Sequence, residues 1–216
     1  MPTQPDATSN GTPSPPGPGR KRRDYAAAAR RLVAATVLLA ALAAAGGWAW
    51  RQPFMAYPRT LFELSRMPPP EALPMPVDGV RAGDVADTWG APRGADRRHE
   101  GVDIFAARGT TVRSTTRGVV LRVADRGLGG RQVWVLGPGR QRHYYAHLDD
   151  WAPGLGAGAV VWPGTALGTV GDSGNARGTA PHLHYGIYGG DGALDPLPLL
   201  RAHAARPPEP APADPR

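Results

Sequence analysis

Short apolar runs broken by glycine constrain the fold of this chain more than any other feature. They recur between residues 80 and 200, they are rich in β-branched and aromatic residues, and no helix of note interrupts them. Regularly spaced short strands with turn residues between them are typical of a compact all-β domain. The sequence therefore predicts an all-β domain over residues 81–200. The expected strands lie at residues 111–114, 118–123, 132–136, 143–148, 166–170 and 182–188.

An uncharged run at residues 32–50 precedes this domain. As a helix it is long enough for about one crossing of a bilayer. Trp48 and Trp50 lie at its C-terminal end, where interfacial aromatic residues gather, and arginines precede it. By the positive-inside rule the N-terminus is cytoplasmic. We therefore expect a single-pass signal anchor in the inner (cytoplasmic) membrane, with the β-domain in the periplasm.

Two other interpretations of this run stay open. Ala43-Ala44-Ala45 resembles a small-residue cleavage site, so the run would be a signal peptide and the domain would be secreted. The run would otherwise be a buried helix of a soluble protein. The long hydrophilic segment before the run favours a retained anchor.

The segments around the run and the domain differ from both in composition. Residues 1–31 are polar and then basic, and we expect a disordered cytoplasmic tail. Residues 51–80 contain many prolines, which predicts a stiff tether with a short helix at residues 60–66. The Pro/Ala/Arg segment at residues 201–216 is expected to be disordered.

The net charge of +7 is largely a property of the N-terminal tail. That tail holds Lys21, the only lysine, and a cluster of arginines, whereas the middle of the chain mixes arginine with many aspartates. We therefore expect no nucleic-acid binding. The chain has no cysteine, so disulfides and thiolate metal sites are excluded. Any metal site must use His, Asp and Glu.

Two pairs of residues supply candidate metal ligands. His182 and His184 lie one residue apart in an apolar run, so on a strand both imidazoles project from one face. His99 and Asp103 lie four residues apart, about 13 Å on a fully extended strand. Gly101 between them allows the backbone to bend, which could bring both side chains to one ion.

These residues together match a known pattern of catalytic zinc. Two histidines and one carboxylate bind the metal, and a fourth position is left for water. His99, Asp103 and one histidine of the 182/184 pair would supply that set. The other histidine would lie beside the water, and His147 is a further candidate to transfer a proton or stabilise an oxyanion.

Several motifs in sequence order carry a resemblance to a known family. The chain resembles the lysostaphin/LytM-type zinc metallopeptidases, which cut peptide bonds in the stem or cross-bridge of peptidoglycan. The resemblance covers residues 80–200, including the closing Asp195-Pro196-Leu197, and neither end of the chain. The motifs are His99-x-Gly101-x-Asp103-Ile104, Gly109-Thr110-x-Val112, Gly118-x-Val120, Tyr145-x-His147-Leu148, Gly168-x-Val170-Gly171-x-Ser173-Gly174 and His182-Leu183-His184.

The resemblance implies a role for each candidate residue. His99, Asp103 and His184 would bind one zinc ion, and His147 and His182 would form the catalytic pair. The implied fold is a small open β-sandwich of mostly antiparallel strands, of the duplicated hybrid motif type. The implied function is a zinc-dependent endopeptidase in cell-wall remodelling, with peptidoglycan as its partner. A tether in an inner membrane and the absence of a visible pentaglycine-binding domain favour the D-Ala cross-link as the target.

One alternative function is a non-catalytic activator of cell-wall amidases, because some members of the family have lost zinc ligands. This chain has all five positions, which favours the enzyme. A lipoyl-type carrier module would need an exposed acceptor lysine, and Lys21 lies in the tail. A regulatory protein partner leaves no signature in the sequence.

Other residues are expected to be structural. We expect His143 at a strand edge and Glu100 in solvent, pointing away from His99. Trp134 and Trp162 are expected in the core.

Overall fold

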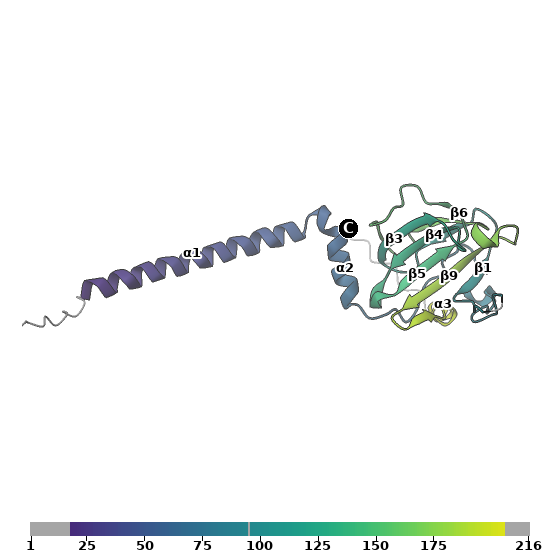
Figure 1. Ribbon diagram of the computed structural model, residues 1–216, viewed down its shortest axis with the longest axis horizontal. Coiled ribbons are helices and arrows are strands. Elements are labelled where there is room, and N and C mark those ends of the chain that lie inside the picture. Colours follow the sequence, from purple (N-terminus) through teal and green to yellow (C-terminus); the bar gives the residue numbers. More distant parts are fainter. Residues whose placement is uncertain (1–17, 95, 206–216) are drawn as a thin grey trace, which may run out of the picture. The chain divides into compact units, whose positions relative to one another are not determined.

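A computed structural model describes residues 18–94 and 96–205 of the chain, which divides into two compact units, Met1–Gln52 and Pro53–Arg216 (Figure 1). Helix α1 (Pro18–Trp50) dominates the first unit. Its segment Tyr25–Trp50 contains an 18-residue window with a mean hydropathy of 2.0 and is long and apolar enough to cross a membrane, by length and composition. The expectation of a disordered tail up to residue 31 is wrong for residues 18–31, because an alanine-rich stretch there favours helix. Residues 1–17 lie outside the described residues.

The second unit is built on two antiparallel sheets, as the predicted all-β sandwich requires. The larger sheet has the order β1-β9-β5-β4-β3-β7, with β10 also paired to β9, and the smaller has the order β2-β8-β6. In the larger sheet the strands are β1 (Val102–Phe105), β3 (Gly118–Asp125), β4 (Arg131–Leu136), β5 (Arg142–Ala146), β7 (Val160–Val161), β9 (His182–Gly189) and β10 (Gly192–Leu194). In the smaller they are β2 (Thr111–Arg113), β6 (Leu148–Trp151) and β8 (Ala166–Val170).

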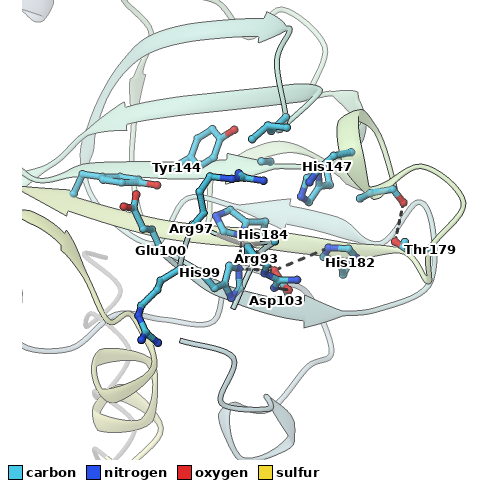
Figure 2. Close-up of a pocket in the computed structure, with 18 of the residues that line it drawn as sticks. Arg93, Arg97, His99, Glu100, Asp103, Tyr144, His147, Thr179, His182 and His184 are labelled. Atoms are coloured by element: carbon cyan, nitrogen blue, oxygen red, sulfur yellow. Dashed lines mark hydrogen bonds and ion pairs between the residues drawn. The ribbon is translucent and has the colours of Figure 1, made fainter. Parts of the chain in front are cut away.

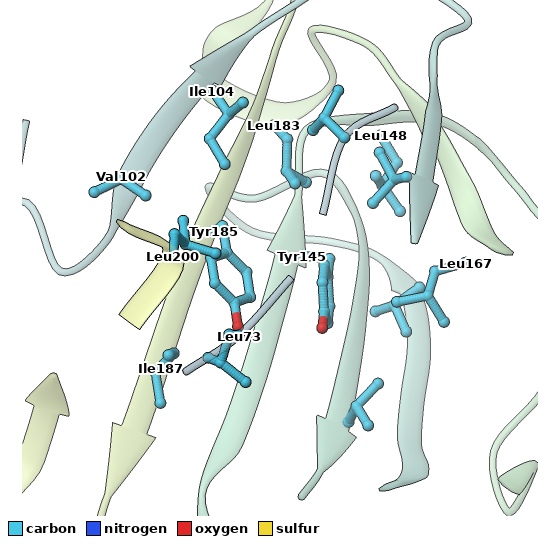
Figure 3. Close-up of a cluster of buried hydrophobic side chains, with 14 of the residues drawn as sticks. Leu73, Val102, Ile104, Tyr145, Leu148, Leu167, Leu183, Tyr185, Ile187 and Leu200 are labelled. Carbon is cyan, nitrogen blue, oxygen red and sulfur yellow. The ribbon is translucent and has the colours of Figure 1, made fainter. Parts of the chain in front are cut away.

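The hydrophobic core brings together side chains from both sheets (Figure 3). Along β9, Leu183, Tyr185 and Ile187 are fully buried in it. Because side chains alternate along a strand, His182 and His184 project from the opposite, outer face. The core thus fixes which face of the larger sheet carries the histidines.

The proline-rich segment before the sheets is part of the folded unit, which corrects the prediction of a tether over residues 51–80. The short helix is longer than expected, at α2 (Ala56–Arg66), and it follows a 3-10 turn, η1 (Pro53–Met55). Leu73 and Val77 are buried in the core, and Leu73 N donates to Leu199 O at 3.0 Å. Extended backbone places alternate residues on one side, so prolines between them do not prevent this burial.

The C-terminal boundary also differs from the prediction. Helix α3 (Leu197–Ala204) buries Leu197 and Leu200, so the expectation of disorder from residue 201 is wrong for residues 201–204. Residues about one turn apart on a helix share a face, so Leu197 and Leu200 can both pack into the core. Residues 206–216 lie outside the described residues. Three further 3-10 turns occur in loops: η2 (Ala82–Asp84), η3 (Pro138–Arg140) and η4 (Gly174–Ala176).

Candidate active site

The candidate metal ligands meet on the outer face of the larger sheet. Asp103 on β1 lies directly opposite His184 on β9 in the antiparallel register, so two residues far apart in the sequence are cross-strand neighbours. His99 comes from the turn before β1. As predicted, His182 and His184 project from the same face of β9. Both side chains line one pocket with His99, Asp103 and His147 (Figure 2).

Three of these side chains converge closely enough to hold a metal ion. His99 Nε2 lies 2.8 Å from His184 Nδ1 and 3.1 Å from Asp103 Oδ1, and His184 Nδ1 lies 3.2 Å from Asp103 Oδ1. Ligand atoms about 2.0–2.1 Å from a tetrahedral zinc ion would be about 3.3 Å apart. The observed separations fit that geometry, and the group is two imidazoles and a carboxylate, ordinary zinc ligands.

Gly101 is what lets His99 and Asp103 approach each other. A Cβ atom at this position would lie 2.6 Å from the Tyr185 carbonyl oxygen and 2.8 Å from Cε1 of His184. Both distances are shorter than real contacts allow. The bend predicted at Gly101 is therefore present, and it needs the missing side chain because β9 lies directly against it.

Two residues that sequence reasoning missed hold the ligands in place. The carbonyl oxygen of Thr88 accepts a hydrogen bond from His99 Nδ1 at 2.7 Å, and its hydroxyl accepts one from the Asp103 backbone N–H at 3.0 Å. Arg93 forms an ion pair with Asp103 Oδ2. Such outer contacts orient metal ligands and fix their tautomers. No local sequence signal marks Thr88 or Arg93, because their roles depend on how the loop before β1 folds.

The carboxylate is held in its charged form. Burial favours the neutral form of Asp103, but its interactions with the His184 and His99 rings outweigh this effect, and the pKa of the carboxyl lies well below its usual range. The pKa of His184 is lowered, first by burial. An anionic carboxylate beside neutral imidazoles is the protonation state in which all three bind a cation.

His147 and His182 face the same pocket without belonging to the close group. His147 Nδ1 donates to Ser173 O at 2.9 Å and His182 Nδ1 donates to Ala180 O at 2.8 Å. Since a carbonyl can only accept, each ring carries its proton on Nδ1 and keeps the Nε2 lone pair free. The ring centroids lie 5.1 Å apart. Burial lowers the pKa of His147 to about 4, so this imidazole is neutral at pH 7.

His147 reaches the outer face through an unusual backbone conformation. On β5, His143 and Tyr145 point into the core while Tyr144 and Ala146 line the pocket. Strict alternation would send the next side chain into the core. Instead His147 has a φ of 62°, and its N–H bonds to Gly129 O at 2.9 Å. This left-handed residue turns the imidazole to the pocket side.

The expectation for His143 is wrong. It lies on β5 between β4 and β9, not at an edge, and is fully buried. Its Nδ1 lies 2.8 Å from the Tyr185 hydroxyl and 3.4 Å from Thr115 Oγ1, while Nε2 has no hydrogen-bond partner among the described residues. Burial lowers its pKa to about 3. His143 is thus a neutral core histidine.

The two tryptophans also lie outside the core, contrary to expectation. Trp134 is half-buried, lines the pocket and stacks on Tyr144 with ring centroids 4.2 Å apart. Trp162 is 54% exposed, and the Arg117 guanidinium lies 4.6 Å from its ring centroid. Glu100 is exposed, as expected, but it lines the same pocket as His99. The pocket has a volume of about 740 Å³ and combines the histidine cluster with an aromatic wall.

Comparison with known proteins places this site in a family. A sequence model of peptidase family M23 matches residues 97–196. The chain is 44% identical over 142 residues to the L-Ala--D-Glu endopeptidase of Bacillus subtilis, covering 61% of this chain and 43% of that protein. It is 34% identical over 107 residues to the DD-carboxypeptidase/endopeptidase Mpg of Neisseria meningitidis serogroup B, covering 50% of this chain and 22% of that protein.

A solved structure agrees with these sequence matches. The antimicrobial peptidase lysostaphin from Staphylococcus simulans has a TM-score of 0.50 and 27% identity, covering 58% of this chain and 53% of that chain. The chain spans less than half the length of the two curated relatives. Residues 97–196 of this chain form a domain of peptidase family M23, homologous to the L-Ala--D-Glu endopeptidase and to lysostaphin.

Proposed function

We propose that this chain is a zinc-dependent endopeptidase that hydrolyses peptide bonds of peptidoglycan. The observation that carries the proposal is the convergence of His99 Nε2, Asp103 Oδ1 and His184 Nδ1 in the pocket of an M23 domain. These three atoms would bind zinc. Bound zinc supplies a Lewis acid that lowers the pKa of a water molecule toward 7 and polarises a carbonyl group.

The residues around that group would carry out the proton transfers. His147 and His182 each present a free Nε2 to the pocket, so either ring can take a proton from water there and release it to the leaving amine. Their Nδ1–H bonds to backbone carbonyls hold the rings in this orientation throughout. A protonated ring at either position would also stabilise an oxyanion.

The apolar helix supports an extracytoplasmic location for the reaction. Segment Tyr25–Trp50 could serve as a membrane anchor or a signal sequence. The basic residues before it favour a cytoplasmic N-terminus, which leaves the M23 domain on the side of the membrane where peptidoglycan lies.

Two bonds are candidates for cleavage. The D-Ala cross-link is the target predicted from the sequence, and the relative that is 34% identical is named a DD-carboxypeptidase/endopeptidase. The bond between L-Ala and D-Glu is the second candidate, because the relative named for it is 44% identical over a longer match. Both belong to the peptides of peptidoglycan.

Digestion of purified peptidoglycan tests the proposal. We expect the full chain in detergent, loaded with zinc, to release soluble muropeptides, and mass spectrometry of the new termini identifies the bond. A zinc chelator should abolish release, and added zinc should restore it. A chain that holds one zinc ion per molecule and yet cleaves neither bond would overturn the proposal and favour the non-catalytic amidase activator.

A further inference from the structure

Three arginines line the pocket from a single turn. Arg93, Arg97 and Arg98 lie between the loop after η2 and strand β1. The turn is closed by an antiparallel bridge between Pro92 and Arg98 and by a hydrogen bond from Arg93 N to Arg97 O at 2.9 Å. His99 follows immediately. The arginines are therefore attached to the same backbone as a candidate zinc ligand.

Two of these arginines already have partners. Arg93 pairs with Asp103 Oδ2, and Arg98 donates from Nη1 to Gly90 O at 3.1 Å. The Arg97 side chain has no hydrogen bond or ion pair within residues 18–94 and 96–205. In Figure 2 it extends toward the region between Tyr144 and His147. A guanidinium thus lies in the pocket with all its donors available.

The acidic residues of the pocket do not neutralise Arg97. Asp103 is one of the three candidate metal ligands and already forms an ion pair with Arg93. Glu100 faces the Tyr188 hydroxyl, where burial, reinforced by the nearby Glu100 carboxylate, raises the pKa of the tyrosine to about 12. Asp96 lines the pocket beside Arg97, but no ion pair joins the two. A guanidinium presents a planar fork of donors that matches a carboxylate in a bidentate pair.

We propose that Arg97 binds a free carboxylate of the substrate beside the scissile amide. This rests on the proposed function, which puts the scissile carbonyl at the ligand group of the same pocket. The carboxylate would belong to the amino acid that supplies the scissile nitrogen. A D-Glu joined onward through its side chain keeps its α-carboxylate free, as does a D-amino acid acylated only on its amine. An internal glycine of a bridge has none, because its carboxyl forms the next peptide bond.

The pocket would therefore select stem-peptide and D-amino-acid amides over glycine bridges. The aromatic wall of Trp134 and Tyr144 cannot make this distinction, because it offers no cation. The distinction depends chiefly on the side chain at position 97, which makes it testable by one substitution.

Matched synthetic substrates test this assignment. Each contains the bond that the wild-type chain cleaves, once with the free α-carboxylate and once with the carboxamide in its place. The full zinc-loaded chain in detergent should prefer the acid by about 10- to 100-fold in kcat/KM, the range for a hydrogen bond to a charged group. Arg97→Ala should remove the preference, mainly through KM of the acid, and should affect kinetics on the amide much less.

Further variants separate charge from packing. Arg97→Lys should restore part of the preference, since it keeps the charge without the fork. Asp96→Asn should lower KM for the acid, because it removes a nearby like charge. Arg122→Ala removes an exposed arginine that does not line the pocket and should change neither substrate's kinetics. Equal zinc content in all variants shows that the site is intact.

The outcomes distinguish this inference from the proposed function. If wild type cleaves acid and amide at equal rates, or Arg97→Ala slows both equally, Arg97 does not read a carboxylate, while the endopeptidase stands. If wild type cleaves neither, the proposed function fails. The affinities of the two peptides, measured by calorimetry, then test the role of Arg97. If wild type and Arg97→Ala bind the acid peptide with equal affinity, the assignment is rejected.

Discussion

Individual side chains of the pocket have different roles, metal binding or proton transfer, and single substitutions should distinguish these roles. His99→Ala or Asp103→Ala removes one of three converging ligand atoms, so zinc and activity should be lost together. His147→Ala leaves the three in place, so zinc content should hold while turnover falls by about 10²- to 10⁴-fold. Metal analysis and muropeptide digestion on the same preparations measure both. Zinc lost from His147→Ala, or retained by Asp103→Ala, contradicts the assignment.

Gly101 gives a second prediction at this scale. In Gly101→Ala the new methyl group meets the Tyr185 carbonyl and the His184 ring, so β1 or His184 must move. We expect at least about a tenfold weaker zinc affinity and a matching loss of activity. Gly83→Ala is the control, since a Cβ there has nothing within 4 Å. Wild-type zinc affinity in Gly101→Ala would show that the bend needs no glycine.

His143 predicts how stability changes with pH. Its folded pKa of about 3 lies below the ordinary 6.5, so between these values the unfolded chain binds the extra proton. Its contribution is complete above pH 6.5 and is lost as pH falls toward 3, with a slope of up to about 1.4 kcal/mol per pH unit.

His143→Gln should flatten this slope, as measured by denaturant unfolding from pH 7 to pH 4. The exposed His203 provides the matched control, and His203→Gln should leave the slope unchanged. The difference between the two variants removes the effect of the other histidines. Identical slopes would mean that His143 does not stay neutral in the folded chain.

Residue-scale prediction from the sequence worked where local geometry decides. The two-residue spacing of His182 and His184 is enough to place both on one face. It failed where distant parts of the chain decide. The left-handed conformation of His147 depends on its bond to Gly129, and the burial of His143 depends on the order of strands in the sheet.

At the scale of elements, the segment between α2 and β1 contributes to the core. Leu73 is 1% exposed and hydrogen-bonds through its backbone to Leu199. Leu73→Ala should therefore destabilise the unit by about 2–5 kcal/mol, as for other buried leucines. Leu121→Ala, at a side chain that is 40% exposed, should cost about 0.5 kcal/mol or less. Equal unfolding free energies for the two variants would show that Leu73 does not contribute to the core and that the segment is a tether.

Most strands found from the sequence lie in apolar runs, and the three-residue strand β2 is predicted from Thr111-Val112. The expected strand at residues 143–148 is divided in the structure between β5 and β6, because His147 breaks it. Strands β1, β7 and β10 were not anticipated, since each has four residues or fewer and no distinctive alternation. Pairing with longer neighbours, not local propensity, holds them.

At the scale of the whole molecule, the apolar helix makes a prediction about location. We expect the full chain to remain in the membrane fraction after washing with salt, and deletion of residues 32–50 to release it. In spheroplasts, added protease should digest the M23 domain and spare a tag on the N-terminus. A mature chain that begins after Ala45 would instead identify the helix as a cleaved signal peptide.

Strand β1 lies at the end of the larger sheet and pairs only with β9 among the described strands. It carries Asp103, the turn before it carries His99, and its neighbour carries His184. An ion held by all three would fasten this edge to the sheet by coordination as well as by backbone hydrogen bonds. Local opening there, seen as fast exchange of the β1 amide protons, would become rare while the ion is bound. The same ion would thus protect the strand that presents it.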